Sequence, residues 1–166
     1  MIRTLSIFFL ALTLPCSIIS SQSVVNTVHN LSATGPGIIK ASSESEICIF
    51  CHTPHSGSPV APLWNRNDPG SFYILYNSTT TDALPGQPDG ASLLCLSCHD
   101  GTIALGNILS RVADIDFSGG VTIMPPAIQL TTDLADDHQV SFANNAALAA
   151  LDRQLERPCC NTPGNT

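Results

Sequence analysis

Positive charge and aromatic side chains are scarce in this chain of 166 residues. Lysine and arginine number six against thirteen aspartates and glutamates, and the resulting net charge of −7 argues against nucleic acid as a partner. Aromatic residues make up 5% of the chain and charged residues 11%. A small domain of this composition buries little apolar surface of its own, so we expect a cofactor to complete its core.

Only the N-terminus carries an apolar run that resembles a targeting segment. Arg3 is followed by the apolar stretch 5–14 and then by the small and polar stretch 15–23. This order predicts a secretory signal peptide over residues 1–23, cleaved after Ser23, because the apolar stretch is too short for a membrane span. Cys16 leaves a lipoprotein alternative, which Pro15 disfavours. We therefore expect a mature chain without a membrane span in the periplasm, at the cell surface or outside the cell.

Four of the seven cysteines lie in two matching motifs. Residues 48–52 and 95–99 both read C-x-x-C-H, the attachment pattern of c-type haem. In that chemistry the two thiols add to the haem vinyl groups, and the histidine that follows binds the iron. The motifs therefore predict two covalent haem c groups, with Cys48, Cys51, Cys95 and Cys98 as attachment sites and His52 and His99 as iron ligands.

Three other interpretations of paired C-x-x-C motifs exist. A zinc site uses this spacing, but a site made of cysteines alone leaves both adjoining histidines unexplained. Two disulfides suit an exported protein and also leave the histidines unexplained. A thioredoxin-like redox motif is expected beside a βαβ pattern, which neither stretch has.

We expect a single domain with two haem-binding units, about residues 24–90 and 91–166. Turn-forming residues dominate between the motifs, which indicates a mostly irregular, loop-rich fold with a few short α-helices and minor strand, organised around covalent haem. The spacing of apolar residues predicts a short helix over residues 103–112. A stronger helix is predicted over residues 144–156, with its start at Asn144 or Asn145 and its end before Pro158. Residues 71–76 predict a short strand or a haem-packing segment.

Three histidines remain as candidates for the sixth position of the two irons. The chain has five histidines, so His29, His55 and His138 are left once the two motifs are assigned. We expect His29 to bind the haem of the first unit and His138 the haem of the second. His55 follows His52 by three residues and is expected to reach a neighbouring haem, a neighbouring subunit or nothing, or to exchange roles with His138.

A methionine and three aspartates elsewhere in the chain are further candidates, each with a functional and a structural interpretation. Met124 precedes a proline, a common setting for a sulfur ligand, but with three spare histidines we rank it first as a packing residue. Asp100 follows His99, and Asp136 and Asp137 precede His138. These carboxylates either orient and tune the imidazoles or lie in solvated turns.

Four segments resemble a known family. They are residues 46–55 (EICIFCHTPH), 61–66 (APLWNR), 92–106 (SLLCLSCHDGTIALG) and 137–142 (DHQVSF). Together they resemble the doubled-C-x-x-C-H family of bacterial multihaem cytochromes c, although that family typically has proline in place of Gln139. The resemblance implies bis-histidine haems of low potential and extracytoplasmic electron transfer, and in some members haem chains or filaments.

The C-terminal end departs from the family pattern. Members of this kind often continue into a further C-x-x-C-H-x-P-H, whereas here the adjacent Cys159 and Cys160 have no histidine after them. Our hypothesis is that a third haem site was lost or that the reading frame ends early. The surplus histidine would then be a ligand without an iron.

The sequence therefore favours an electron carrier over an enzyme. Two irons with imidazole on both faces have no position for substrate, so we expect electron transfer with redox proteins or extracellular acceptors as partners. One alternative is a haem reductase or peroxidase with one open iron. The other is a self-assembling subunit of a haem-bearing extracellular filament.

Overall fold

The chain is loop-rich and has only short helices in the residues that the structure describes. The computed structural model describes residues 23–152 and 154–156. The predicted signal peptide, apart from Ser23, and the adjacent cysteines near the C-terminus lie outside these residues. Two α-helices and three 3-10 helices occur: η1 (Val24–Asn26), η2 (Cys48–Phe50), α1 (Gly90–His99), η3 (Ser118–Gly120) and α2 (Ala146–Leu151). This architecture confirms the irregular fold class.

The predicted minor strand is wrong for the part of the chain that is described. Strand pairing there is limited to isolated bridges, and Ile74, within the stretch 71–76, forms one of them with Asp133. The same stretch instead supplies Tyr73, which is 1% exposed and packs against Leu96 and Leu134. One buried side chain is enough to hold a packing segment in place, whereas a strand needs a run of backbone hydrogen bonds to a neighbouring strand.

Helix α1 is the central regular element, and it packs between two groups of apolar residues. Leu96 and the partly buried Leu93 contact a small cluster around Tyr73. Cys98 packs against the larger core cluster, which contains Leu31, Ile39, Ala41, Phe50, Leu105, Phe117 and Met124. The helix ends at His99 because Gly101 turns the chain with φ of 78°, in the left-handed region that glycine tolerates.

Residues 103–112 form turns rather than the predicted helix. Their backbone groups bond to distant segments: the Leu105 amide donates to the Thr122 carbonyl and the Leu109 amide donates to the Asn65 carbonyl. Gly106 lies so close to the carbonyl of Ile115 that a Cβ atom would clash there. These tertiary hydrogen bonds replace the helical ones, so the apolar residues of this stretch enter the core from a loop.

The predicted C-terminal helix is present but shorter. It forms α2, whose cap is Asn145: its side chain accepts hydrogen bonds from the amides of Ala147 and Leu148. The helix ends at Leu151, several residues before the predicted end. None of the helices in the described residues is long and apolar enough to cross a membrane.

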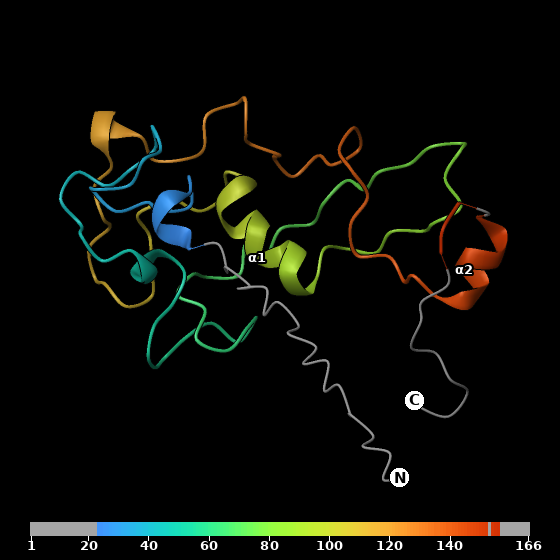
Figure 1. Cartoon of the computed structure of the whole chain (residues 1–166), viewed down its shortest axis with the longest axis horizontal. Coiled ribbons are helices and arrows are strands. Elements are labelled where there is room, and N and C mark those ends of the chain that lie inside the picture. Colours follow the sequence, from blue (N-terminus) through green and yellow to red (C-terminus); the bar gives the residue numbers. More distant parts are fainter. Residues whose placement is uncertain (1–22, 153, 157–166) are drawn as a thin grey trace, which may run out of the picture.

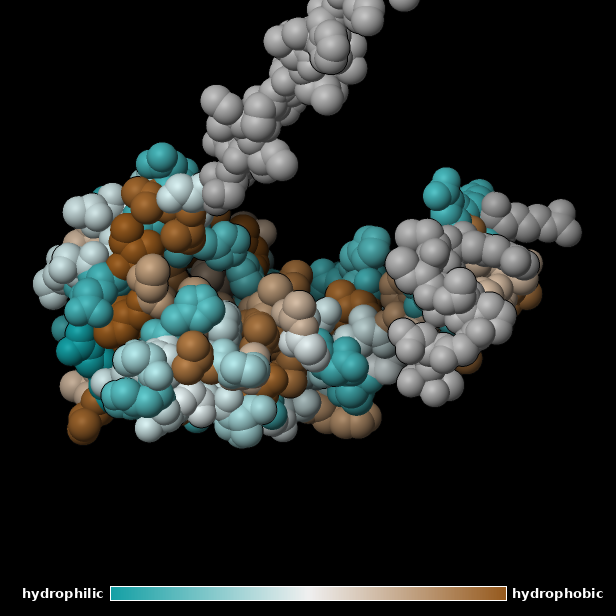
Figure 2. All heavy atoms as spheres, turned by 60° about the horizontal axis from the view of Figure 1, so that its bottom comes forward, coloured by the Kyte–Doolittle hydropathy of each residue, from teal (hydrophilic) through white to brown (hydrophobic). Residues whose placement is uncertain are grey.

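The described chain is elongated, with α1 near its middle (Figure 1). The N-terminal segments and the loop that carries η3 lie on one side of α1, and α2 lies at the opposite end. Apolar atoms gather on the wider part in the view of Figure 2. Some large apolar side chains are exposed, among them Val28 (69% exposed) and Ile38 (90% exposed).

Candidate cofactor site

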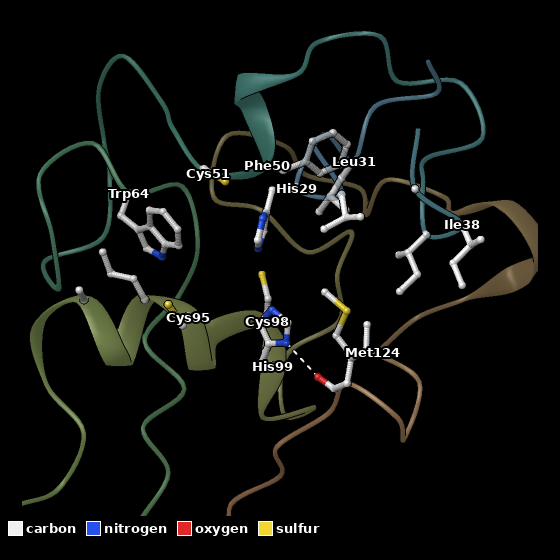
Figure 3. A pocket seen from close by; sticks show the side chains of 16 residues that line it. His29, Leu31, Ile38, Phe50, Cys51, Trp64, Cys95, Cys98, His99 and Met124 are labelled. Atoms are coloured by element: carbon white, nitrogen blue, oxygen red, sulfur yellow. Dashed lines mark hydrogen bonds between the residues drawn. The ribbon is translucent and has the colours of Figure 1, made fainter. Parts of the chain in front are cut away.

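An apolar cavity of about 470 Å³ opens beside α1 (Figure 3). This volume lies in the range of pockets that hold small molecules and cofactors. Five segments form its wall: the N-terminal stretch, η2 with the residue after it, the loop that carries Trp64, α1, and the loop that carries Met124 and Ile128. The apolar wall includes Val28, Leu31, Ile38, Ile39, Phe50, Trp64, Leu94, Met124 and Ile128.

Two histidines from distant parts of the chain face one another across this cavity. The ring centres of His29 and His99 are 6.5 Å apart and their planes are inclined by 64°. Metal–imidazole bonds are about 2 Å long, so two imidazoles on opposite sides of one metal ion have ring centres roughly 6 Å apart. Figure 3 shows the two rings pointing toward each other. Their spacing is therefore that of two ligands sharing one metal ion.

The ring of His99 is oriented by a backbone carbonyl. His99 Nδ1 lies 2.9 Å from the carbonyl oxygen of Ile128. Because a carbonyl can only accept, Nδ1 carries the proton, and the unprotonated Nε2 is left as the metal-binding atom. No sequence pattern identifies such a partner, since any residue at position 128 would supply the same carbonyl.

Three of the four motif cysteines line the same cavity. Cys95 and Cys98 reach it from α1, and Cys51 reaches it from the first motif. Burial, the largest cause, raises the pKa of the Cys51 thiol and also that of the Cys98 thiol. Together with Cys48, these residues are free thiols in the structure rather than disulfide partners.

Trp64 contributes a buried polar atom that has no partner. Its Nε1 is one of two buried side-chain nitrogen or oxygen atoms in the described residues that lack a hydrogen bond. Buried donors are nearly always satisfied, so an unpartnered N–H in a cavity wall suits a ligand that carries an acceptor. Haem has both an apolar ring and carboxylates. The apolar wall, the two imidazoles, the thiols and this donor together fit such a group.

The first motif has a different geometry. Cys48–Phe50 form one turn of 3-10 helix, and His52 after it is exposed. The His52 ring meets Trp64 edge to face, with ring centres 6.1 Å apart. His52 does not line the cavity. The structure therefore brings His29 to the second unit, whereas the sequence argument had assigned it to the first.

His138 lies elsewhere in the molecule. It lines a separate cavity of about 590 Å³ together with Tyr76, Asp136, Asp137 and other residues. Ser141, three residues later, accepts a hydrogen bond from the Asp89 amide at the first turn of α1, whereas His99 is in the last turn. His138 therefore lines a different cavity from His99, and its pairing with a haem stays a prediction.

The remaining candidates from the sequence are placed as follows. Met124 is 6% exposed, belongs to the larger core cluster and also lines the cavity. Asp100 does not bond to His99; its carboxylate accepts hydrogen bonds from the Tyr73 hydroxyl at 2.7 Å and from Thr102. His55 is exposed, and its carbonyl accepts a hydrogen bond from the hydroxyl of Thr53.

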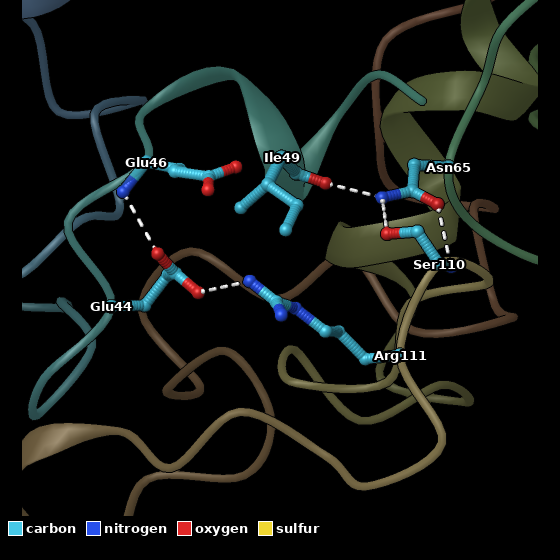
Figure 4. Close-up of polar contacts among 6 residues, drawn as sticks. All are labelled: Glu44, Glu46, Ile49, Asn65, Ser110 and Arg111. Atoms are coloured by element: carbon cyan, nitrogen blue, oxygen red, sulfur yellow. Dashed lines mark hydrogen bonds and ion pairs between the residues drawn. The ribbon is translucent and has the colours of Figure 1, made fainter. Parts of the chain in front are cut away.

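A polar network that the sequence did not reveal ties the first motif to the rest of the fold (Figure 4). The buried Asn65 amide group donates to the Ile49 carbonyl at 2.6 Å and to the Ser110 hydroxyl at 2.8 Å. Its oxygen accepts from the Ser110 amide. Nearby, Arg111 forms an ion pair of 3.0 Å with Glu44. The first motif is therefore anchored through its backbone, not through its histidine.

Within residues 23–152 and 154–156, no three or more histidine, cysteine, aspartate or glutamate side chains are grouped so that they could hold a metal ion by themselves. No protein-family model matches this chain, and no curated protein matches its sequence.

Proposed function

We propose that this protein is an extracytoplasmic dihaem cytochrome c that transfers electrons. Haem c would be attached covalently at Cys48 and Cys51 and again at Cys95 and Cys98. The observation that carries the proposal is the pair of facing imidazoles, His29 and His99, in an apolar cavity that the cysteines of the second motif also line.

The residues of the second unit have separable tasks in this proposal. His99, whose ring is oriented by the Ile128 carbonyl, and the facing His29 are the residues that would hold the iron of a bound haem. The apolar wall excludes water. This would disfavour the more highly charged oxidation state of a bound haem and would reduce the solvent rearrangement that accompanies electron transfer. When bound, a haem held by two imidazoles would supply one-electron chemistry and would leave no position for substrate.

Export and partner choice follow from the composition and the N-terminal segment. The predicted signal peptide would direct the chain to the compartment where c-type haem is attached. The net charge of −7 suits a partner protein or an extracellular acceptor with a positive surface. Self-assembly through an inter-subunit ligand is the alternative partner arrangement, and electron micrographs of the purified protein distinguish it.

Production of the full chain in a host that attaches c-type haem tests the proposal. We expect a red protein whose intact mass exceeds that of the mature polypeptide by two haems, which survive denaturation and stain on a gel. Electron paramagnetic resonance of the oxidised protein should contain a low-spin bis-histidine signal. A colourless protein with the bare polypeptide mass contradicts the function itself, and cyanide binding to one iron in the protein as isolated favours the enzymatic alternative.

A further inference from the structure

Arg66 is a fully buried cation beneath the second unit, with an exposed fraction of 0%. Its contacts are all with backbone carbonyls. Nε and Nη2 donate to the Ser97 carbonyl at 3.1 and 2.9 Å, and Nη1 donates to the Leu105 carbonyl at 2.9 Å. Further contacts join Nη2 to the Ala104 carbonyl at 3.1 Å and Nη1 to the Asn107 carbonyl at 3.4 Å.

These hydrogen bonds join the end of α1 to the loop 104–107. Ser97 is in the last turn of α1, where carbonyl groups have no partner within the helix. This turn also carries Cys98 and His99. A planar guanidinium carries several N–H donors in a fixed fork, so it can bond two segments at once and fix their relative position. The single ammonium group of lysine cannot reproduce that fork.

Arg66 forms no ion pair in the described residues, and the buried Asp100 carboxylate, three residues after Ser97, accepts hydrogen bonds from Tyr73 and Thr102. Among the described residues the one ion pair is that of Arg111 with Glu44. The partial negative charge at the C-terminal end of α1 compensates the guanidinium in part. Charge interactions are weakly screened in a buried environment, and the carbonyl that Arg66 binds belongs to Ser97, which lies directly before Cys98 and two residues before His99. Its field therefore reaches the cavity.

We propose that Arg66 is the positioning residue of the second unit and that its buried charge raises the reduction potential of the iron bound by His99. This inference rests on the proposed function. Reduction adds an electron to the site, so a nearby fixed positive charge stabilises the reduced state. The same side chain holds the last turn of α1 in the position from which Cys98 and His99 reach the cavity.

A charge-removing variant and a matched control test the electrostatic part. Arg66→Met and Arg111→Met remove the same charge, the first from a buried site and the second from a side chain that is 45% exposed. Redox titration of the full-length holoprotein, followed by electron paramagnetic resonance, resolves the two haems. We expect Arg66→Met to lower the ferrous-to-ferric ratio of one haem about tenfold at fixed potential, a downward shift of about 59 mV.

The outcomes separate local from general effects. Arg111→Met should change that ratio less than about threefold, because water screens an exposed charge. An unchanged potential in Arg66→Met overturns the proposal, and so does an equal shift in both variants, since the effect would then be one of net charge. A wild-type protein without haem contradicts the proposed function instead, so the two failures are distinguishable.

Arg66→Lys provides the second measurement, and it decides the matter if the methionine variant does not mature. Lysine keeps the charge but loses the fork. We expect Arg66→Lys to carry both haems, to hold the wild-type potentials and to melt at a lower temperature than wild type. A potential about 59 mV below that of wild type overturns the role of the charge, and an unchanged melting temperature overturns the positioning role.

Discussion

The stretches 48–52 and 95–99 carry the same residue types at the same spacing, but they differ in structure. The second lies on the ten-residue helix α1, and its histidine faces another imidazole in a cavity. The first forms one turn of 3-10 helix, and its histidine is exposed beside Trp64. The motif thus specifies the reactive groups, while the flanking chain decides how those groups are presented.

The flanking residues explain this difference. Cys95 is preceded within α1 by Ala91, Ser92 and two leucines, and leucine and alanine favour a helix. Leu93 and Leu96 anchor that helix by packing with Tyr73. After the first motif, Pro54 prevents helix continuation, and the Thr53 amide donates to the Leu63 carbonyl instead. The first unit is consequently held by loop contacts.

Removal of the cysteine pairs should produce the largest effect. Cys48→Ala with Cys51→Ala, and Cys95→Ala with Cys98→Ala, should each remove one covalent haem from the intact mass. Only the second double variant should also remove the low-spin signal that depends on His29, because the facing imidazoles belong to that unit. If each double variant removes both haems, the two units do not bind haem independently.

Replacement of the opposed histidine is the sharpest test of the pairing. His29→Ala should convert one of the two haems to a high-spin iron that binds cyanide, since His99 loses its partner. His138→Ala is the matched control, because its ring lines the other cavity. A high-spin haem in both variants restores the pairing that the sequence suggested, in which each of these histidines serves a different haem.

Tyr73 supports the second unit through Asp100, and its loss should have an intermediate effect. Tyr73→Phe leaves one oxygen of the buried Asp100 carboxylate without its donor, which should cost about 1–3 kcal/mol in the free energy of unfolding. Tyr76→Phe, at a half-buried tyrosine, is the control and should cost less than about 1 kcal/mol. Denaturant unfolding of both holoproteins measures the difference, and equal losses contradict it.

The same tyrosine predicts a pH dependence. Burial first, and then the hydrogen bond to Asp100, raises the pKa of Tyr73 well above its ordinary value of 10.0. The folded state therefore holds this proton more tightly than the unfolded state. The resulting stabilisation is complete below about pH 10 and is lost as the pH rises above that value. Unfolding measured from pH 8 to 11 should be steeper in pH for wild type than for Tyr73→Phe.

The smallest expected effect concerns thiol reactivity. It should distinguish the first cysteine of each motif from the second, and should not distinguish one motif from the other. In the chain without haem, Cys48 and Cys95 are exposed, whereas Cys51 and Cys98 are partly buried with raised pKa values. At pH 8 a larger share of the buried thiols stays protonated, so they should react with iodoacetamide several-fold more slowly. Peptide mapping after timed alkylation measures the four rates, and equal rates contradict the burial of the second cysteine in each motif.

Much of the fold class was predictable from composition, but individual elements were not. The abundance of turn-forming residues correctly indicated a loop-rich chain, and Asn145 correctly marked the start of α2. Residues 103–112 misled, because their apolar spacing suits a helix while their amides bond to Thr122 and Asn65. Such long-range hydrogen bonds leave no periodic signature in the sequence.

The candidate site divides in the same way. The two motifs identified the four cysteines and the two adjoining histidines without any structure, because covalent attachment requires those residues side by side in the chain. Arg66 and Asn65 were recognisable only as parts of a family-like segment, and their carbonyl partners were not predictable. Backbone carbonyls are present at every position, so only the fold decides which of them accepts a hydrogen bond.

The sequence by itself determined the chemistry that this protein offers: paired thiols, each pair followed by an imidazole, in an acidic chain with little core of its own. Only the tertiary structure decided that His29 faces His99, that His138 lines a separate cavity and that a buried arginine bonds to the last turn of α1. The physical reason is the separation of the residues along the chain. Bonds to one haem edge need neighbours in sequence, whereas opposite faces of one metal ion are supplied by residues that folding brings together.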